Sequence, residues 1–272
     1  AGGLDLEAIS PRVGPEHTAV ITDVRSAGLS DGLTVTATLD PTAQPFLDDH
    51  RIDGTAVLPG VMGIESFAEV AQLLYPDRSI TAIEDINFLA PFKFYRDEPR
   101  ELKVMAVFAP DGDDIVATCR LIGERTLPNQ EEPQVTEHFT GRVRLSPEGN
   151  DPLTVDPQAE GDASVQADDI YRIYFHGPAY QVLDHAWPSG AGATGRFVDE
   201  LPPNHTADAD TVTDPRLIEL CFQTAGVWEI ATNGVMALPT RIDRVIPRTR
   251  AGQASGPLQA QITPTGDGGF DT

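Results

Sequence analysis

A histidine on a short loop that leads directly into a helix is the residue best placed for chemistry in this sequence. His50 is followed by Gly54 and Pro59, and an apolar helical pattern begins at Gly60. This spacing places an imidazole beside a helix N-terminus, where free backbone N–H groups and the positive end of the helix dipole stabilise a developing oxyanion. We expect Gly54 to permit close backbone approach and Pro59 to fix the entry into the helix. The pattern predicts proton abstraction next to a carbonyl, with His50 as base and the Gly60 N–H polarising that carbonyl, although a lone histidine is more commonly structural.

A carboxyl group far along the chain is the candidate acid. Glu219 and Gln223 lie four residues apart, so they share one face of a helical pattern whose other members are mostly apolar. Desolvation there would raise the pKa of Glu219 and keep it protonated near neutral pH, as a general acid requires, while Gln223 orients the acid or the substrate hydroxyl. The alternative is an ordinary surface carboxylate. Asp214 fits an N-cap, with Pro215 in the first helical position.

Four further residues have more than one interpretation. Glu65 lies in the nearly all-apolar helix after Gly60 and could be a second acid, a partner for a backbone donor or the relic of a duplicated site; we favour a structural role. Tyr174, His176 and Tyr180 surround a Gly-Pro turn, where they could line a substrate channel or pack in the core.

The elements that must position these groups begin with a hairpin over residues 18–40, where apolar and polar side chains alternate. Residues 60–75 form a predicted helix that is apolar nearly all round and therefore buried. Four strand patterns follow, at residues 79–88, 101–108, 115–124 and 138–145. Long antiparallel strands wrapped round one buried helix are typical of a hot-dog fold.

The second half repeats this plan less clearly. Residues 147–166 are rich in Pro, Gly and acidic residues, which predicts a linker between an N-terminal hot-dog (1–146) and a C-terminal one (167–272). The C-terminal elements are a helix over 215–231 and strands near 191–198, 241–246 and 258–262. Aligning the two helices pairs Ile64-Glu65 with Ile218-Glu219 and Glu69 with Gln223, a faint internal repeat. The predicted fold class is α+β, a double hot-dog in which two antiparallel sheets each wrap round a buried helix.

Composition narrows the function. The formal charge of −23 and the sequence pI near 4.4 argue against nucleic acid and anionic membrane as partners, because both are bound through clustered Lys and Arg. No apolar run has the length of a membrane helix, so we expect a cytoplasmic protein, and Cys119 and Cys221 are expected as free thiols. No spacing typical of a metal site, nucleophile elbow, dinucleotide loop or P-loop occurs. Acid–base catalysis without metal or cofactor is the remaining expectation.

Four motifs then carry a family resemblance. His50-x3-Gly54-x4-Pro59 resembles the HxxxGxxxxP signature of polyketide synthase dehydratase domains. In the same order as in that family, Tyr174-x-His176-Gly177-Pro178-x-Tyr180 is similar to GYxYGPxF, Leu217-Ile218-Glu219-x3-Gln223 to LLDxxxQ, and Leu238-Pro239-Thr240-Arg241-Ile242 to LPFxW. The segments around His176 and Glu219 look most like iterative enediyne-type synthases, with polyunsaturated fatty acid synthases as relatives. The segment from Leu58 to Glu65 also looks like single hot-dog fatty-acid dehydratases, in which the Glu is catalytic.

The resemblance implies a reaction and its partners. A β-hydroxyacyl thioester on the phosphopantetheine arm of an acyl carrier protein would lose its C2 proton to His50 and its C3 hydroxyl, as water, to Glu219. The family has Asp at the position of Glu219, and the extra methylene puts the reach of the acid in question. A domain of charge −23 would repel an acidic carrier in trans, so we expect the carrier and other synthase domains in the same polypeptide; a homodimer is left open. The alternatives are a catalytically silent hot-dog scaffold, and a product-template-like cyclase or hot-dog thioesterase.

Overall fold

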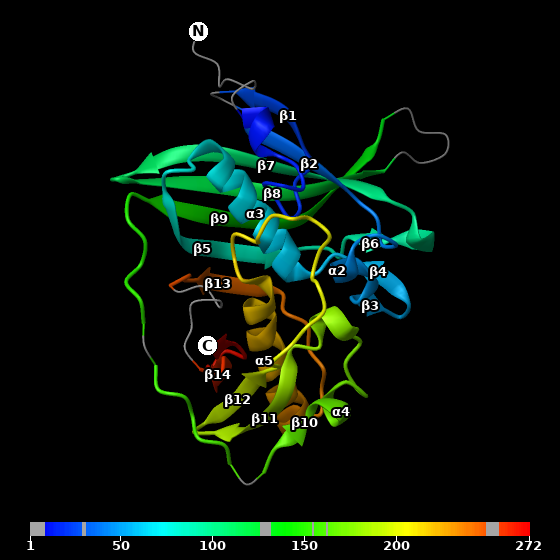
Figure 1. Cartoon of the computed structure of the whole chain (residues 1–272), viewed down its shortest axis with the longest axis vertical. Helices are drawn as coiled ribbons and strands as arrows, with labels where there is room; N and C mark the ends of the chain where they lie inside the picture. The colour runs from blue at the N-terminus through cyan, green and yellow to red at the C-terminus, as the bar shows by residue number, and fades with distance from the viewer. Residues whose placement is uncertain (1–8, 29–30, 126–131, 154, 162, 249–255) are drawn as a thin grey trace.

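The larger half of the molecule is an antiparallel sheet curved round one helix. The computed structural model describes residues 9–28, 31–125, 132–153, 155–161, 163–248 and 256–272. Seven strands pair in the order β1-β2-β7-β8-β9-β5-β13, and helix α3 (Gly60–Leu74) lies against them (Figure 1). The strands are β1 (Asp23–Gly28), β2 (Gly32–Leu39), β5 (Ser79–Phe88), β7 (Arg100–Asp111), β8 (Asp114–Arg125), β9 (Gln134–Ser146) and β13 (Arg241–Val245).

The predicted strands and hairpin of this half are all present. β5 spans the predicted residues 79–88, and β7, β8 and β9 each extend their predicted ranges at both ends. β1 and β2 form the N-terminal hairpin, although residues 29–30 of its turn lie outside the described residues. β2 is largely buried, whereas β1 lies at the edge of the sheet and has no buried residue. The period-two alternation of their sequences predicts both as strands.

Helix α3 is buried on every side, as its sequence predicts. Its apolar residues from Val61 to Leu73 are at most 5% exposed. Gly63 allows the close approach to the sheet, because a Cβ there would lie only 2.2 Å from Cδ2 of Phe139 on β9. Two charged residues, Glu65 and Glu69, are buried in the same helix and need partners from outside it.

The loop before α3 is shaped by a small sheet. It contains β3 (Arg51–Ile52), β4 (Thr55–Val57) and β6 (Lys93–Phe94), and the short helix α2 (Pro45–Asp48) precedes it. Asp53 and Gly54, the two residues between β3 and β4, have φ of +49° and +76°, the pattern of a type I′ hairpin turn. Nothing lies within 4 Å of a Cβ built on Gly54. The expectation of close backbone approach at Gly54 is therefore wrong, and the turn conformation is what requires glycine.

The second half is smaller and is built round helix α5 (Pro215–Asn233), which packs on a five-stranded sheet (Figure 1). Asp214 and Pro215 occupy the predicted N-cap and first helical positions. The helices α3 and α5 contact each other, so the two halves share an interface. The sheet order is β10 (Val165–Gln166), β11 (Leu183–Ser189), β12 (Gly192–Phe197), β14 (Gln259–Pro264) and β15 (Phe270–Asp271), with α4 (Ala167–Ile170) beside β10.

One C-terminal strand departs from the predicted division at residue 167. β13 pairs antiparallel with β5 and so extends the N-terminal sheet instead of joining the C-terminal one. The linker prediction also overlaps β10, whose two residues pair with β11. Strand patterns show that a segment is extended but carry no information about which partner it chooses.

Two smaller expectations concern the cysteines and membrane spans. Cys119, which is buried in the N-terminal core, and Cys221 on α5 are both free thiols, as expected. Among the described residues, no helix combines the length and the hydropathy needed to cross a bilayer.

Candidate active site

His50 is held in a single tautomer by the strand that follows it. Its Nδ1 lies 2.8 Å from the carbonyl oxygen of Val57, and the Val57 N–H donates to the His50 carbonyl at 3.0 Å. A carbonyl oxygen only accepts, so Nδ1 carries the proton and Nε2 keeps its lone pair. Burial first, and then the charge of His176, lower the pKa of His50 to about 4. The ring is therefore neutral near pH 7, with an unprotonated Nε2 that could accept a proton.

The Gly-Pro turn of the C-terminal half lies directly against this histidine. His50 and His176 form an antiparallel β-bridge, and their ring centroids are 5.5 Å apart. Asp49 holds the turn through two hydrogen bonds. Its carbonyl oxygen accepts the Gly177 N–H at 2.7 Å and its Oδ2 accepts the Ala179 N–H at 2.8 Å. Gly177 is required at this point, since a Cβ would lie 2.3 Å from Oδ1 of Asp49. Segments more than a hundred residues apart thus form one side of the site.

Glu219 projects from α5 toward the same turn. Its Oε1 lies 3.2 Å from Nε2 of His176 and accepts a hydrogen bond of 3.0 Å from Nε2 of Gln223, one helical turn further on. Glu219 is 5% exposed and Gln223 2%. Both groups meet Oε1, and among the described residues no hydrogen bond to Oε2 is present. The front-half histidine and the back-half carboxyl are also close enough to perturb each other's charge.

The charge state of Glu219 differs from the sequence prediction. Burial alone would raise its pKa, but the hydrogen bond and charge of His176, the charge of His50 and the Gln223 amide together lower that pKa below its usual value. The prediction that desolvation keeps Glu219 protonated is therefore wrong for the free protein. The sequence could show the apolar neighbours of Glu219 on its own helix but not an imidazole delivered by another segment.

Gln223 is fixed by a set of hydrogen bonds that defines its amide orientation. Tyr171 donates its hydroxyl proton to Oε1 of Gln223 at 2.8 Å, while Nε2 of Gln223 also donates to the Tyr180 carbonyl at 2.9 Å. The Tyr171 oxygen in turn accepts the Leu183 N–H at 2.8 Å. This arrangement leaves Nε2 aimed at Glu219, the orienting role predicted for Gln223.

The aromatic residues of the turn pack in the core round the two histidines, and lining of a substrate channel stays a prediction for them. Tyr174 donates to the Gln223 carbonyl at 2.8 Å, and its ring lies 5.7 Å from that of His176. Tyr180 is fully buried, with its ring 6.0 Å from that of His50. Phe175 stacks on His176 at 4.3 Å and meets His50 edge-on at 5.1 Å. These rings are core residues that also form the walls round the two histidines.

Glu65 is not beside the histidines but at the junction of the two halves. Its carboxylate accepts the N–H groups of Val212 and Thr213 and the Thr213 hydroxyl, at 2.5, 2.8 and 2.5 Å. Of its predicted roles, the partner for backbone donors fits this geometry. Glu65 thereby fixes the segment that leads into α5, and so helps to place Glu219.

Pro59 and Gly60 lie where the sequence placed them. Pro59 is the N-cap residue of α3 and Gly60 its first residue. A Cβ on Gly60 would lie 2.8 Å from the Phe88 ring, so only glycine fits there. The Gly60 N–H as a donor to a substrate carbonyl stays a prediction.

The sequence analysis does not identify two residues that this site depends on, Asp49 and Tyr171. Asp49 adjoins His50, so proximity to a candidate was an available signal for it. Tyr171 carries no comparable signal, because only the fold brings it to Gln223.

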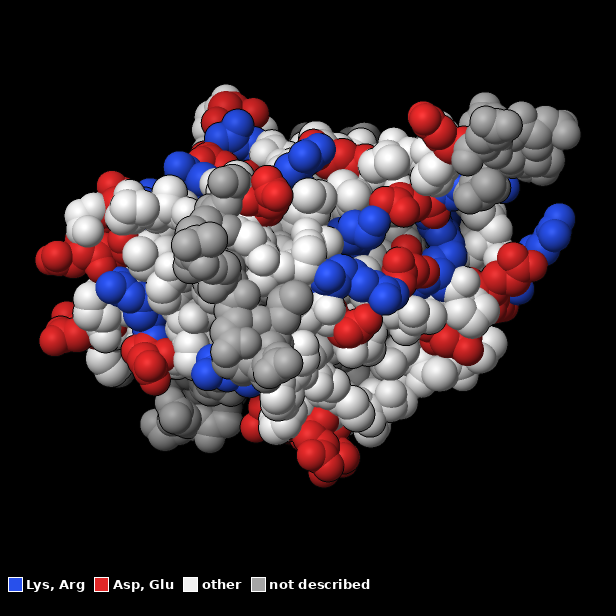
Figure 2. Space-filling view, turned by 90° about the horizontal axis from the view of Figure 1, so that it is seen from above, with Lys and Arg blue, Asp and Glu red and all other residues white. Residues whose placement is uncertain are grey.

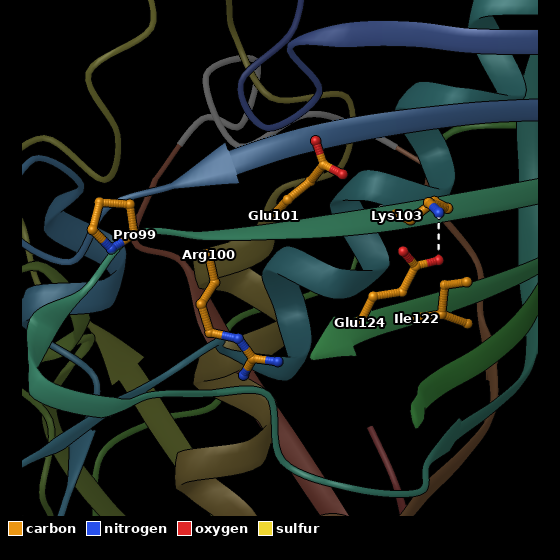
Figure 3. Close-up of a pocket in the computed structure, with 6 residues that line it drawn as sticks. All are labelled: Pro99, Arg100, Glu101, Lys103, Ile122 and Glu124. Carbon is orange, nitrogen blue, oxygen red and sulfur yellow. Dashed lines mark hydrogen bonds and ion pairs between the residues drawn. The ribbon is translucent and has the colours of Figure 1, made fainter. Parts of the chain in front are cut away.

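A hollow on the outer face of the large sheet is separate from these residues. Figure 3 shows it beside β7 and β8, with Lys103 and Glu124 joined across it by an ion pair. Its lining is Pro99, Arg100, Glu101, Lys103, Ile122 and Glu124. Basic and acidic side chains alternate here, and none of the candidate site residues lines this pocket.

The buried helix α3 lies in the curve of one antiparallel sheet and α5 packs on a second one. This arrangement, with His50 before α3 and Glu219 on α5, defines a double hot-dog domain. A family model described as "Polyketide synthase dehydratase domain" matches residues 17–118, and one described as "Polyketide synthase dehydratase N-terminal domain" matches residues 149–270. The chain belongs to the polyketide synthase dehydratase family.

Individual relatives agree with this assignment. The chain is 26% identical over 227 residues to a polyunsaturated fatty acid synthase subunit of Thraustochytrium sp., covering 80% of this chain and 8% of that protein. It is 26% identical over 228 residues to the pikromycin polyketide synthase component PikAII of Streptomyces venezuelae, covering 79% and 6%. The dehydratase domain from the CurF module of curacin polyketide synthase superimposes with a TM-score of 0.70 at 19% identity, over 89% of this chain and 87% of that one. The chain spans less than a tenth of the length of these two curated relatives.

Proposed function

We propose that this chain is the dehydratase domain of an iterative type I polyketide synthase. Its substrate would be a β-hydroxyacyl thioester on the phosphopantetheine of an acyl carrier protein, and its product the α,β-enoyl thioester. The observation that carries the proposal is the meeting of His50, from the N-terminal half, with the His176–Glu219 pair of the C-terminal half in one buried site. A base and an acid on opposite sides of a short carbon chain are what elimination of water requires.

His50 is the base in this proposal. With Nδ1 committed to Val57, Nε2 takes the proton from C2 of the substrate, and the electron pair left on C2 forms the new double bond. The C3–O bond breaks as the hydroxyl receives a proton through Glu219 and leaves as water. The Gly60 N–H at the start of α3 would polarise the thioester carbonyl, a contribution of about 3 kcal/mol for one good donor. Side chains of this chain alone carry every proton, so the proposed reaction needs no metal or cofactor.

The iterative, polyene-building character and the partners are part of the same proposal. A relative named as part of a polyunsaturated fatty acid synthase supports repeated dehydration of a growing chain. The great length of the relatives supports a carrier protein and other synthase domains in one polypeptide. On the face seen in Figure 2, basic side chains lie next to acidic ones. Surface ion pairs, of which Arg25–Glu101 is one, neutralise part of the basic charge of the molecule. Such a surface offers little attraction to an acidic carrier in trans, whereas tethering supplies a high effective concentration.

The test is to incubate the chain with a β-hydroxyacyl carrier protein and follow the mass of the acyl group. We expect loss of one water, and a reduction of about 10²- to 10⁴-fold in rate for His50→Gln. His138→Gln is the matched control. His138 is also a buried histidine, and its Nδ1 is hydrogen-bonded to the Ala90 carbonyl oxygen at 3.0 Å, but it is not part of the site. Free acid would instead indicate a thioesterase and a ring product a cyclase. An unchanged substrate would indicate a scaffold.

A further inference from the structure

A hollow of about 330 Å³ lies at the edge of the large sheet, where β13 pairs with β5 (Figure 1). We call it the arginine hollow, and its lining includes Thr81, Glu84, Arg144, Asn150, Arg244 and Arg248. Its charged groups are three guanidinium groups and one carboxylate, whereas acidic residues outnumber basic ones by 42 to 19 in the whole chain. The local charge is therefore the reverse of the overall charge.

Glu84 on β5 holds the arginines in and beside the hollow. This carboxylate is 4% exposed. Its Oε1 lies 3.2 Å from Nη2 of Arg244, and its Oε2 lies 3.4 Å from Nη2 of Arg142 and from Nη2 of Arg144. Glu84 is thus shared by three guanidinium groups and cannot neutralise all of them. Two of these arginines have further acidic partners outside the lining, which are Asp85 for Arg142 and both Asp111 and Asp114 for Arg144.

The excess of positive charge resides on Arg244 and Arg248. Among the described residues, Arg244 pairs with no carboxylate other than Glu84. Arg248 pairs with none, and its Nη1 donates to the backbone carbonyl oxygen of Asp151 at 3.0 Å. A guanidinium group has five N–H donors, so most of the donors of these two side chains are left for a ligand.

The backbone round the hollow is fixed by contacts between the two halves of the molecule. Nδ2 of Asn150 donates to the Thr81 carbonyl oxygen at 2.8 Å and to the Pro247 carbonyl oxygen at 2.7 Å. Thr81 is in β5, and Pro247 directly precedes Arg248. Arg244 is held beside the same strand by the pairing of β13 with β5. The backbone positions of both arginines are therefore set before a ligand binds, which lowers the cost of ordering the site.

We propose that the arginine hollow binds a phosphate group, either free inorganic phosphate or the phosphate of a small monoester. Arg244 and Arg248 donate to its oxygens, because the planar fork of a guanidinium group matches two phosphate oxygens. A phosphate monoester carries a charge of about −1.5 to −2 at neutral pH, so it balances the excess positive charge better than a carboxylate does. The volume of the hollow is at the lower end of the range of small-molecule sites, roughly 300–1,000 Å³.

The test is isothermal titration calorimetry with inorganic phosphate at low ionic strength, because salt screens exposed charges. We expect saturable binding of one phosphate per chain. Arg244→Gln and Arg248→Gln should each weaken binding by about tenfold or more, since each removes charge-assisted hydrogen bonds to the ligand. Both arginines are exposed, so we expect the variants to fold. Absence of saturable binding by the wild type overturns the proposal.

Arg241→Gln is the matched control for these variants. Arg241 lies in the same strand as Arg244, and the two side chains are 57% and 59% exposed. It pairs with Asp85 and Asp243 and does not line the hollow. Its substitution should change the dissociation constant by less than about twofold. Equal weakening by Arg241→Gln and Arg244→Gln would show a general attraction of anions to this edge of the sheet and would overturn the proposal.

Thermal unfolding supplies a second measurement. Sodium phosphate should raise the Tm of the wild type more than that of the double variant Arg244→Gln with Arg248→Gln, because a ligand that binds only the folded state stabilises it. Equal rises, which exclusion of phosphate from protein surfaces would produce, overturn the proposal. Glycerol 3-phosphate then distinguishes the two sources of the phosphate group. Tighter binding than inorganic phosphate indicates a monoester as the ligand, and equal or weaker binding indicates the free ion. None of these measurements involves dehydration, so their outcome is independent of the proposed function.

Discussion

Asp49 and Ala179 are joined by a hydrogen bond of 2.8 Å from the Ala179 N–H to Oδ2 of Asp49, across the boundary between the two halves. The residues that adjoin this bond are the two histidines: His50 follows Asp49, and His176 begins the turn that the bond closes. The position of His50, the proposed base, relative to the turn that bears His176 is therefore set by the carboxylate of Asp49.

The first prediction concerns this carboxylate. Asp49→Ala should lower the free energy of unfolding by about 1–3 kcal/mol, because the Ala179 N–H loses a charged acceptor in a half-buried setting. It should also slow dehydration, since the turn bearing His176 loses its support. Urea denaturation and the single-turnover rate measure the two effects.

Two companion variants make this prediction specific. Asp49→Asn keeps an acceptor oxygen and should retain most of both quantities. Asp48→Ala removes the exposed neighbour, which pairs with Arg51 at the surface, and should change stability by less than about 1 kcal/mol. Equal losses for Asp48→Ala and Asp49→Ala would contradict the role assigned to Asp49.

The second prediction addresses the glutamate that stands where the family has aspartate. Glu219→Asp restores the family residue but withdraws the carboxyl by one methylene from Nε2 of His176 and from Gln223. We expect Glu219→Asp to be slower than wild type and faster than Glu219→Gln, which should lose about 10²- to 10⁴-fold in rate because an amide carries no proton to give. If Glu219→Gln dehydrated the substrate at the wild-type rate, a group other than Glu219 would have to deliver the proton to the leaving hydroxyl.

The sequence predicted most of the N-terminal half because local rules govern it. Period-two strands and an all-round apolar helix are signatures that each segment carries alone, and they placed β5 and α3 to within a residue. His50, His176 and Glu219 could be singled out in the same way, from residue type and neighbours. Local patterns do not show which strand a segment pairs with. The sequence therefore predicts β13 in the C-terminal half, whereas the structure pairs it with β5 of the N-terminal sheet.

The protonation states of the site residues could not be predicted from the sequence, for the same physical reason. Glu219 was expected to be neutral because its helix neighbours are apolar, whereas its pKa depends on His176, which only folding brings within 3.2 Å. Tyr171 likewise reaches Gln223 across 52 positions of the chain. Electrostatic properties are pairwise and long-range in sequence, so they become predictable only once the fold is known.

The third prediction separates two tyrosines that contact one glutamine. Tyr171→Phe removes the donor to Oε1 of Gln223 and frees the amide to turn its Nε2 away from Glu219. Tyr174→Phe removes a hydrogen bond of the same length, 2.8 Å, but to the Gln223 backbone carbonyl. Tyr174→Phe should cost about 1 kcal/mol of stability, and Tyr171→Phe about twice as much because it also removes the acceptor of the Leu183 N–H. Only Tyr171→Phe should reduce kcat beyond what stability explains. Equal kcat values in the two variants would show that the amide orientation is irrelevant.

The last prediction concerns a buried carboxyl pair on α3. Glu69 accepts the N–H groups of Ala19, Val20 and Ile21 at 2.6, 3.0 and 2.9 Å, and it lies one turn from Glu65. Burial first, and then the charge of Glu65, raise the pKa of Glu69 to about 8 from an ordinary value of 4.5. Between these values the folded state keeps the Glu69 proton while the unfolded state has lost it, so raising the pH favours unfolding. The stability due to this group is fully present below pH 4.5, and its loss is complete above the folded pKa of about 8.

Above pH 6.5 the effect of Glu69 can be measured separately from that of His50. The pKa of His50 is lowered from 6.5 to about 4, so above pH 6.5 its contribution to the free energy of unfolding no longer changes with pH. From that pH to about 8, the wild type should lose up to about 1.4 kcal/mol of unfolding free energy per pH unit. Glu69→Gln, which cannot ionise, should lack this slope even if it is less stable throughout. Glu124→Gln, at an exposed ion pair with Lys103, should keep it. Urea denaturation at a series of pH values measures all three slopes, and parallel curves for wild type and Glu69→Gln would show that Glu69 does not hold a proton in the folded protein.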